Sequence, residues 1–173
     1  MQTSTVAIQV ALAADIQWRG QGERKVSFTV AVPESAPDVA LRMARTADIP
    51  AIRALIEPHV ASGRLLQRAT TEIEYLLPTF VIAECKGAIV GCAALEVYSS
   101  RLAEVRSLAV RGDLRGMGVG RRLVQACVDI ARERKVLEVM AITSNERFFR
   151  AVGFDFTLQN ERVALFIRTR DET

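Results

Sequence analysis

The feature that most constrains this chain is a glycine-rich turn between an apolar strand-like run and a long amphipathic run. The apolar run ends at Leu108-Ala109-Val110, and the turn follows as Arg115-Gly116-Met117-Gly118-Val119-Gly120. Beyond the turn, apolar residues recur at helical spacing: Leu123, Val124, Cys127 and Ile130. The pattern therefore predicts a strand, a turn almost free of side chains, and a helix that begins near Gly118 or Gly120 and runs to Lys135.

A turn of this kind favours a phosphorylated ligand. Alternate glycines strip the turn of side chains, so that consecutive backbone N–H groups can point into one small volume. The first-turn amides of the helix and its positive dipole end add to these donors. We expect a diphosphate site formed by backbone groups of residues 116–121. The alternative is a turn that connects strand and helix and binds nothing, because short glycine motifs recur by chance.

Spacing separates this turn from two other phosphate-binding loops. A Walker loop ends in Gly-Lys-Ser/Thr, whereas Gly120 is followed by Arg121-Arg122. A dinucleotide fingerprint has the spacing G-x-G-x-x-G, whereas the three glycines here lie two residues apart. The turn resembles the acetyl-CoA signature of the GNAT superfamily of N-acetyltransferases, Gln/Arg-x-x-Gly-x-Gly/Ala, which is matched by Arg115, Gly118 and Gly120.

Length and composition fit one soluble domain. The chain has 173 residues, of which 50% are hydrophobic and 25% charged, and this length suffices for one well-buried core. No apolar run approaches the roughly 18 residues of a membrane span, and no basic residue precedes the short apolar run Val6–Ala14. The three cysteines, Cys85, Cys92 and Cys127, have no metal-ligand spacing. We expect a cytoplasmic protein with no metal site, no membrane partner and buried cysteines.

Positive charge is concentrated around the glycine-rich turn. Residues 101–135 contain nine Lys/Arg and four Asp/Glu, whereas the net charge of the whole chain is +3. A small polyanion suits such a surface. Nucleic acid is the alternative partner and is not expected, because the chain has no helix-turn-helix or zinc pattern and its aromatic residues do not alternate with basic ones.

The chain divides near residue 39. Residues 1–39 are expected to form an N-terminal extension, poorly ordered or contributing one strand, and residues 40–170 the acetyltransferase domain. Strands are expected at Leu41–Met43, Phe80–Cys85, Ala88–Tyr98, Ala103–Val110, Val136–Ile142 and Val163–Ile167. Helices are expected at Asp48–Glu57, from Thr71 to before Pro78, from the glycine turn to Lys135, and at Glu146–Val152. This mixed α/β (α+β) order matches the acetyltransferase order over residues 41–168. The resemblance implies the GNAT fold, a splayed mixed sheet flanked by helices.

Three local signals mark ends of these elements. Asp48 is expected to cap the helix that follows it. Thr71-x-x-Glu74 has the spacing of a capping box for the next helix. Lys86-Gly87 is expected to join two strands in a hairpin.

The resemblance also implies where acetyl-CoA binds. In the acetyltransferase fold two neighbouring parallel strands splay apart, and the pantetheine arm enters the gap. Backbone groups of Leu108, Ala109 and Val110 would pair with the arm, opposite the strand Val136–Ile142, and a backbone N–H of that segment would polarise the thioester carbonyl. The other implied contacts are Arg115, Gly116, Met117, Gly118, Val119, Gly120 and Arg121 for the diphosphate and Asn145 for the arm.

Glu104 is the candidate general base. The pKa of a peptide α-amine is about 8, so that most of it is unreactive ammonium at pH 7 and a proton acceptor assists acetylation. Glu104 precedes Leu108 at the spacing where the histone-acetylating branch of the family places its catalytic glutamate. Strand alternation predicts that Glu104, Arg106, Leu108 and Val110 share one face. The alternative is a solvated Glu104–Arg106 pair at the edge of the strand.

Arg68 and Arg106 are candidates for binding a substrate carboxylate, because a guanidinium holds a carboxylate with two hydrogen bonds. Four segments resemble the acetyltransferase domain of N-acetylglutamate synthases: Gly63–Arg68, Ile89–Leu95, Ala103–Val110 and Phe148–Phe154. That resemblance implies an acidic amino acid, L-glutamate first, as acetyl acceptor, and a place in arginine biosynthesis. The alternative for both arginines is surface salt bridging, worth at most about 1 kcal/mol each.

One position departs from the family pattern. Many members have a tyrosine four residues before the Gly-Phe pair, where its hydroxyl protonates the CoA thiolate, and this chain has Phe149 there.

The sole histidine, His59, is expected on a surface loop at a helix end, and Tyr98 receives no role. Two functional alternatives stay open: acetylation of a polyamine, an antibiotic or a protein N-terminus, and a CoA-binding module without catalysis. The sequence also leaves a homodimer open.

Overall fold

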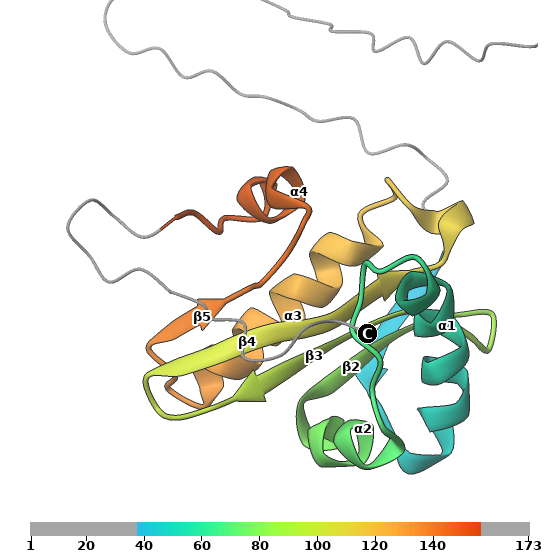
Figure 1. The fold of residues 1–173 in the computed structure, drawn as a ribbon, viewed down its shortest axis with the longest axis horizontal. Coiled ribbons are helices and arrows are strands. Elements are labelled where there is room, and N and C mark those ends of the chain that lie inside the picture. The colour runs from blue at the N-terminus through green and yellow to red at the C-terminus, as the bar shows by residue number, and fades with distance from the viewer. Residues whose placement is uncertain (1–37, 157–173) are drawn as a thin grey trace, which may run out of the picture. The chain divides into compact units, whose positions relative to one another are not determined.

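The computed structural model describes residues 38–156 (Figure 1). Five strands form one mixed sheet in the order β1-β2-β3-β4-β5. They are β1 (Val39–Met43), β2 (Phe80–Cys85), β3 (Ala88–Val97), β4 (Leu102–Val110) and β5 (Glu138–Met140). The helices are α1 (Ile49–Ala61), α2 (Thr70–Leu76), α3 (Val119–Glu133) and α4 (Glu146–Ala151), with 3-10 turns η1 (Thr46–Asp48), η2 (Leu77–Thr79) and η3 (Gly112–Leu114). The predicted mixed α+β fold is confirmed; the proposed extension up to residue 37 and the strand Val163–Ile167 lie outside the described residues.

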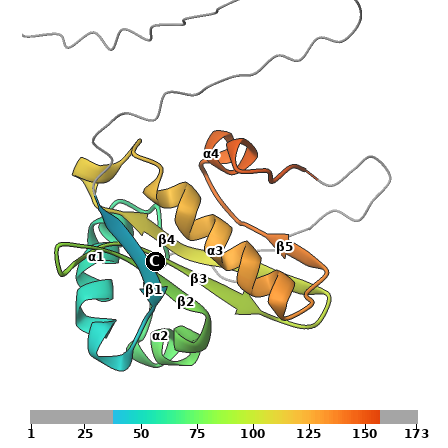
Figure 2. The same ribbon diagram turned by 180° about the vertical axis from the view of Figure 1, so that it is seen from behind.

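Helices cover both faces of the sheet (Figures 1 and 2). α1 and α2 pack on one face, where Ile52 and Ile73 are almost fully buried. α3 crosses the opposite face and buries Leu123 and Cys127 there, as its apolar spacing predicts. Burial of a large aliphatic side chain such as Ile52, Ile73 or Leu123 contributes about 1.5–3 kcal/mol. Among residues 38–156, no helix is long and apolar enough to cross a membrane.

The acidic residue at the start of α1 has a different partner from the one expected. Asp48 does occupy the N-cap position, but its carboxylate does not bond the amides of α1. It accepts instead from the backbone N–H of Arg45 at 2.7 Å and from the guanidinium of Arg42 on β1 at 2.7 and 3.0 Å. Asp48 therefore fixes the connection between β1 and α1, and α1 continues past the expected end at Glu57 to Ala61.

The start of α2 also differs from the prediction. α2 begins at Thr70, and the carboxylate of Glu72 accepts from the backbone N–H of Ala69 at 2.8 Å. The expected capping box of Thr71 and Glu74 is therefore wrong: because the N-cap is Ala69, two residues earlier, the glutamate in the first turn is Glu72. The hairpin prediction is confirmed, since β2 and β3 join at Lys86-Gly87, both with positive φ.

β4 contains a β-bulge at its middle. Cys92 of β3 pairs with Ala109, whereas Ala94 pairs with Arg106, so that β4 has one residue more than β3 between these two pairs. Ser107 lies within this stretch and has a φ of 53°. A bulge of this kind bends a strand and changes which residues share a face.

The bulge overturns one prediction about side-chain direction. Before it, Ala103 and Val105 belong to the apolar cluster under α3; after it, Leu108 and Val110 belong to that same cluster. Ala109, by contrast, packs with the cluster under α1 and α2. The prediction that Glu104 and Arg106 share a face with Leu108 and Val110 is therefore wrong, because simple alternation does not continue through Ser107.

β5 pairs only with the first three residues of β4. The three parallel pairs are Leu102–Glu138, Ala103–Val139 and Glu104–Met140. β5 is shorter than the expected strand Val136–Ile142, and after Met140 the chain leaves β4 and rises toward α4 (Figure 1). No described strand pairs with this edge of β4 beyond Glu104, so that Val105–Val110 present an open strand edge. This is the splayed sheet that the resemblance to the acetyltransferases implies.

Candidate functional site

The glycine-rich turn connects the open end of β4 to α3. Gly116 and Gly118 have φ values of 78° and 80°, a region that glycine adopts without strain, and a Cβ on either would meet nothing within 4 Å. The first helical hydrogen bond runs from Arg122 N to Gly118 O at 3.1 Å. Three amides therefore precede the hydrogen-bonded ladder of α3, those of Val119, Gly120 and Arg121. The turn has the open space and donors that a diphosphate needs, and that ligand stays a prediction.

The side chain of Arg115 connects the turn to β4 and α1. The Arg115 side chain reaches back to Val110 O, with Nε 3.4 Å away, and its Nη2 lies 3.4 Å from His59 Nε2. His59 lies in the last turn of α1, so that the expected surface loop is wrong. Burial, and then the charges of Arg115 and Arg64, lower the pKa of His59 below its ordinary value. The Met117 side chain is half exposed.

Asn145 and Phe149 both contribute to the structure of α4. Asn145 caps the helix, and its Oδ1 accepts from Phe148 N at 3.3 Å. Phe149 is buried and makes edge-to-face contacts with the rings of Phe148 and Phe154 at 5.2 and 5.3 Å. The phenylalanine at the family's tyrosine position is therefore a core residue, and the predicted contact of Asn145 with acetyl-CoA stays a prediction.

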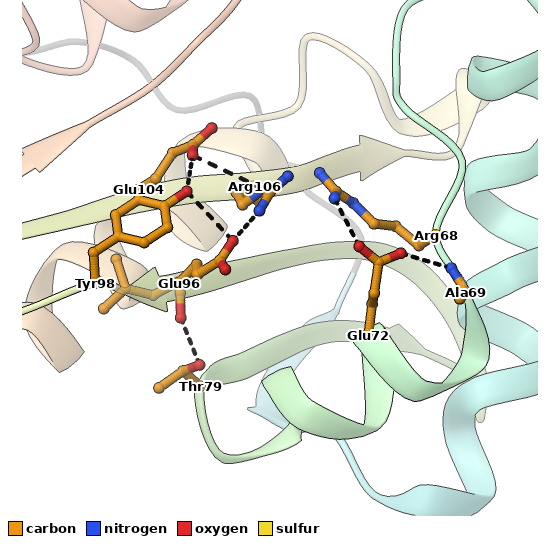
Figure 3. Close-up of polar contacts among 9 residues, drawn as sticks. Arg68, Ala69, Glu72, Thr79, Glu96, Tyr98, Glu104 and Arg106 are labelled. Carbon is orange, nitrogen blue, oxygen red and sulfur yellow. Dashed lines mark hydrogen bonds and ion pairs between the residues drawn. The ribbon is translucent and has the colours of Figure 1, made fainter.

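Glu104 lies at the point where β4 and β5 separate (Figure 3). Its side chain is largely buried, and its Oε2 accepts from the hydroxyl of Tyr98 at 2.5 Å. The same Oε2 lies 3.9 Å from Arg106 Nε. A surface charge pair, the alternative for Glu104 and Arg106, does not describe these two side chains, which are 9% and 19% exposed.

Glu104 also faces a second carboxylate across the sheet. Glu96 of β3 is its direct antiparallel partner, and like charges in this position destabilise a strand pair. Arg106 Nη1 donates to Glu96 Oε2, and the Tyr98 hydroxyl lies 3.4 Å from that same oxygen. Arg106 and Tyr98 therefore each contact both carboxylates and offset their repulsion.

Arg68 completes this cluster from the segment before α2. Its Nη1 lies 3.4 Å from Glu72 Oε1, and its side chain is only 10% exposed. The buried Nε of Arg68 and that of Arg106 have no hydrogen-bond partner within the part of the chain that the structure describes. Figure 3 shows the two guanidinium groups pointing toward one another.

The two arginines line one open cavity of about 200 Å³ between β3, β4 and α2. Its other lining residues are Thr71, Glu72, Tyr75, Leu76 and Glu96. The structure thus brings Arg68, Arg106 and Glu104 into one neighbourhood, whereas Leu108 and Val110 face α3. Each guanidinium group has one hydrogen-bonded carboxylate partner, Glu72 for Arg68 and Glu96 for Arg106, and a carboxylate between the two arginines would add a second partner to each.

Sequence reasoning missed Tyr98 and Glu96. The signal for both is the register of the β3–β4 hairpin, in which Val97 pairs with Ala103 and Glu96 with Glu104. Tyr98 is the first residue after β3, and its backbone N–H bonds Leu102 O at 3.0 Å. Once that register is known, Glu96 and Tyr98 lie on the face of Glu104.

Comparisons with known proteins agree with this architecture. The family model described as Acetyltransferase (GNAT) family matches residues 50–154. An uncharacterized N-acetyltransferase of Chlorobaculum tepidum is 38% identical over 119 residues, 69% of this chain and 77% of that protein. An amino-acid acetyltransferase of Mycobacterium tuberculosis is 34% identical over 117 residues, 66% of this chain and 67% of that protein.

Solved structures show the same likeness. N-acetylglutamate synthase of Neisseria gonorrhoeae, in complex with coenzyme A and N-acetyl-glutamate, has a TM-score of 0.66 and 32% identity. The match covers 72% of this chain and 30% of the synthase, so that the chain corresponds to under a third of that enzyme. A Mycobacterium tuberculosis protein in complex with CoA has a TM-score of 0.65 and 32% identity over 72% of this chain and 76% of its own. The chain belongs to the GNAT family of N-acetyltransferases.

Proposed function

We propose that this acetyltransferase transfers the acetyl group of acetyl-CoA to the amine of a small acceptor that carries a carboxylate, with L-glutamate as the first candidate. The observation that carries the proposal is the pair of largely buried arginines, Arg68 and Arg106, that line one cavity, with Arg106 in contact with Glu104. Two kinds of relative support it: the amino-acid acetyltransferases named above, and the synthase solved with N-acetyl-glutamate.

The glycine-rich turn fits the diphosphate of the cosubstrate. A Cβ on Gly116 or Gly118 would project into open space. The free amides of the first turn of α3 are donors for phosphate oxygens. Arg115 and Arg121 add positive charge. The open edge of β4 over Leu108–Val110 has backbone groups for the pantetheine arm. The acetyl thioester supplied by acetyl-CoA is the electrophile.

Glu104 is placed to take a proton from the acceptor amine. Tyr98 and Arg106 contact its Oε2, and the hydrogen bonds within residues 38–156 leave Oε1 without a partner. In the proposed reaction the amine nitrogen forms the new C–N bond as the C–S bond breaks. Glu104 Oε1 accepts the proton that the nitrogen loses, directly or through a water molecule.

The cavity carries both signs of charge, Arg68 and Arg106 with Glu72 and Glu96, and this mixture suits an amino acid, which is itself a zwitterion. A carboxylate between Arg68 and Arg106 would pair with two guanidinium groups and separate two like charges. The acceptor's ammonium group would then lie toward the carboxylates of Glu96 and Glu104. A polyamine would place a cation against the two guanidinium groups and leave their Nε donors unpaired. The three free cysteines are consistent with a reducing compartment such as the cytoplasm.

Thiol release measured with a panel of acceptors tests the proposal. The panel contains L-glutamate, L-aspartate, L-glutamine, L-arginine, spermidine and an alanine-initiated peptide. We expect kcat/KM to be highest for an amino acid with a free α-carboxylate and lowest for spermidine. Turnover of spermidine or the peptide alone would contradict the proposed acceptor class. Binding of CoA in calorimetry without turnover of any acceptor would instead identify a non-catalytic module.

A further inference from the structure

We propose that Tyr98 is the positioning residue of the general base: its hydroxyl, together with Arg106, holds Oε2 of Glu104 so that Oε1 faces the acceptor amine. The inference rests on the proposed role of Glu104 as base. It adds a residue outside the glycine-rich turn and outside the arginine pair, contributed by the connection between β3 and β4.

The geometry around Glu104 carries the proposal. The Tyr98 hydroxyl lies 2.5 Å from Glu104 Oε2, within the range of a strong hydrogen bond to an ionised acceptor. Arg106 Nε, at 3.9 Å from the same oxygen, is too far for a hydrogen bond and contributes charge. Tyr98 is therefore the only hydrogen-bond donor to Glu104 among the side chains of residues 38–156.

The second carboxylate explains why a positioning donor is needed. Glu96 lies directly across from Glu104 and accepts the hydrogen bond from Arg106 Nη1, so that Arg106 makes no hydrogen bond to Glu104. Without the phenol, repulsion from Glu96 would act on a carboxylate that no hydrogen bond holds. The Glu104 side chain would then take other rotamers, and its oxygens would lose their fixed direction toward the acceptor.

Tyr98 acts as a donor and does not transfer its own proton. Burial, and then the adjacent Glu104 carboxylate, raise the pKa of Tyr98 above its ordinary value of 10.0, so that the phenol stays protonated at neutral pH. When Glu104 Oε1 takes the amine proton, Oε2 becomes a weaker acceptor. The hydroxyl then has a second acceptor in Glu96 Oε2 at 3.4 Å. The Tyr98 hydroxyl can therefore donate to whichever of the two carboxylates is ionised and keep its own proton.

The test is a double-mutant cycle of Tyr98→Phe and Glu104→Gln, with full pH–rate profiles. Tyr98 is 48% exposed, and phenylalanine keeps the ring, so that the variant is expected to fold with a Tm close to the parent's. We expect Tyr98→Phe to lower kcat by about tenfold, with the KM for acetyl-CoA unchanged and the acid limb of the kcat/KM profile moved to higher pH. The double variant should be no slower than Glu104→Gln alone, because Tyr98 acts only through Glu104.

The outcomes separate this inference from the proposed function. If Tyr98→Phe has the kcat and pH profile of the parent while Glu104→Gln is inactive, the positioning role is wrong and the base assignment stands. If the losses of the two single variants multiply in the double variant, Tyr98 acts independently of Glu104 and the inference is also wrong. If Glu104→Gln keeps full activity at every pH, the proposed base itself is wrong.

Discussion

The thiol of Cys92 donates a hydrogen bond to the carbonyl oxygen of Ser107 at 3.3 Å, from β3 to the bulge of β4. Both residues are buried, and burial raises the pKa of the Cys92 thiol to about 12, so that the thiol stays a donor. The sequence predicts only that Cys92 is a small buried side chain. In the structure it also satisfies a carbonyl at the bulge that separates Arg106 from Leu108.

We expect Cys92→Ala to lower the free energy of unfolding more than Cys127→Ala does, by about 1 kcal/mol, because it leaves the Ser107 carbonyl unsatisfied. Cys127 is the matched control: it is also fully buried, and its thiol makes no hydrogen bond to the described residues. Urea unfolding of both variants measures the difference. Equal losses would mean that the hydrogen bond to Ser107 contributes nothing.

Ser107 itself is held at a φ of 53°, where a β-branched side chain is strained. We expect Ser107→Val to be about 1–3 kcal/mol less stable than Ser107→Gly, since only glycine adopts this region freely. The valine variant should also lose kcat, because the bulge sets the direction of Arg106 and Glu104 relative to Leu108–Val110. Thermal unfolding and thiol release check the two effects. A valine variant as stable and active as the glycine variant would show that the bulge has no specific role.

The sequence predicts those parts of the site that depend on local spacing. The turn at Gly116–Gly120, the buried stripe of α3 and the β2–β3 hairpin all follow from patterns within a few residues. The parts that depend on strand register could not be predicted from local spacing. One inserted residue at Ser107 reverses the faces of Leu108 and Val110. Glu96 and Glu104 are neighbours only through the pairing of β3 with β4. The wrong capping box at α2 also arises from a choice that local spacing leaves open. Glu72 and Glu74 can each lie in the first turn of a helix, and packing determines where the helix begins.

Gly118→Glu tests the glycine-rich turn. The variant should lose acetyl-CoA binding by calorimetry, because its carboxylate would project into the open space where the phosphates are expected. Gly87→Glu is the matched control: Gly87 also has a positive φ, 76°, and open space around it, but it lies in the β2–β3 hairpin. Both variants pay a similar backbone strain, so that a loss of binding confined to Gly118→Glu assigns the effect to the turn. Unchanged binding by a folded Gly118→Glu would refute the phosphate site.

Arg68→Gln tests the acceptor cavity. A hydrogen bond to a charged group contributes about 1.5–3 kcal/mol, so that the KM for an amino-acid acceptor should rise by about 10–100-fold while acetyl-CoA affinity stays unchanged. Arg68→Lys keeps the charge but not the planar fork, and its KM should lie between those of the parent and the glutamine variant. Arg132→Gln, on the exposed side of α3, is the control. An unchanged acceptor KM in Arg68→Gln would remove Arg68 from the binding site.

The link between β1 and α1 predicts an acid-dependent loss of stability. The hydrogen bond from Arg42 holds the pKa of Asp48 below its ordinary value of 3.8, against the opposing effect of burial. A carboxylate with a lowered pKa in the folded state stabilises the fold above the unfolded value, and this contribution is lost as the pH falls through the folded value. Asp48→Asn should therefore be less stable than the parent at pH 6, by about 1.5 kcal/mol, and the difference should be smaller at pH 2.5, below the unfolded value of 3.8.

Asp113→Asn is the matched control for this comparison. Asp113 also pairs with an arginine, Arg111, at 2.7 Å, but their side chains are 60% and 45% exposed. Solvent screens such a pair, so that its removal should change stability little at any pH. Urea unfolding at pH 6 and pH 2.5 measures all three proteins. The free energies of unfolding of Asp48→Asn and the parent could instead differ by the same amount at both pH values. The ionised form of Asp48 would then not stabilise the connection between β1 and α1, and packing or neutral hydrogen bonds at that position would account for any loss.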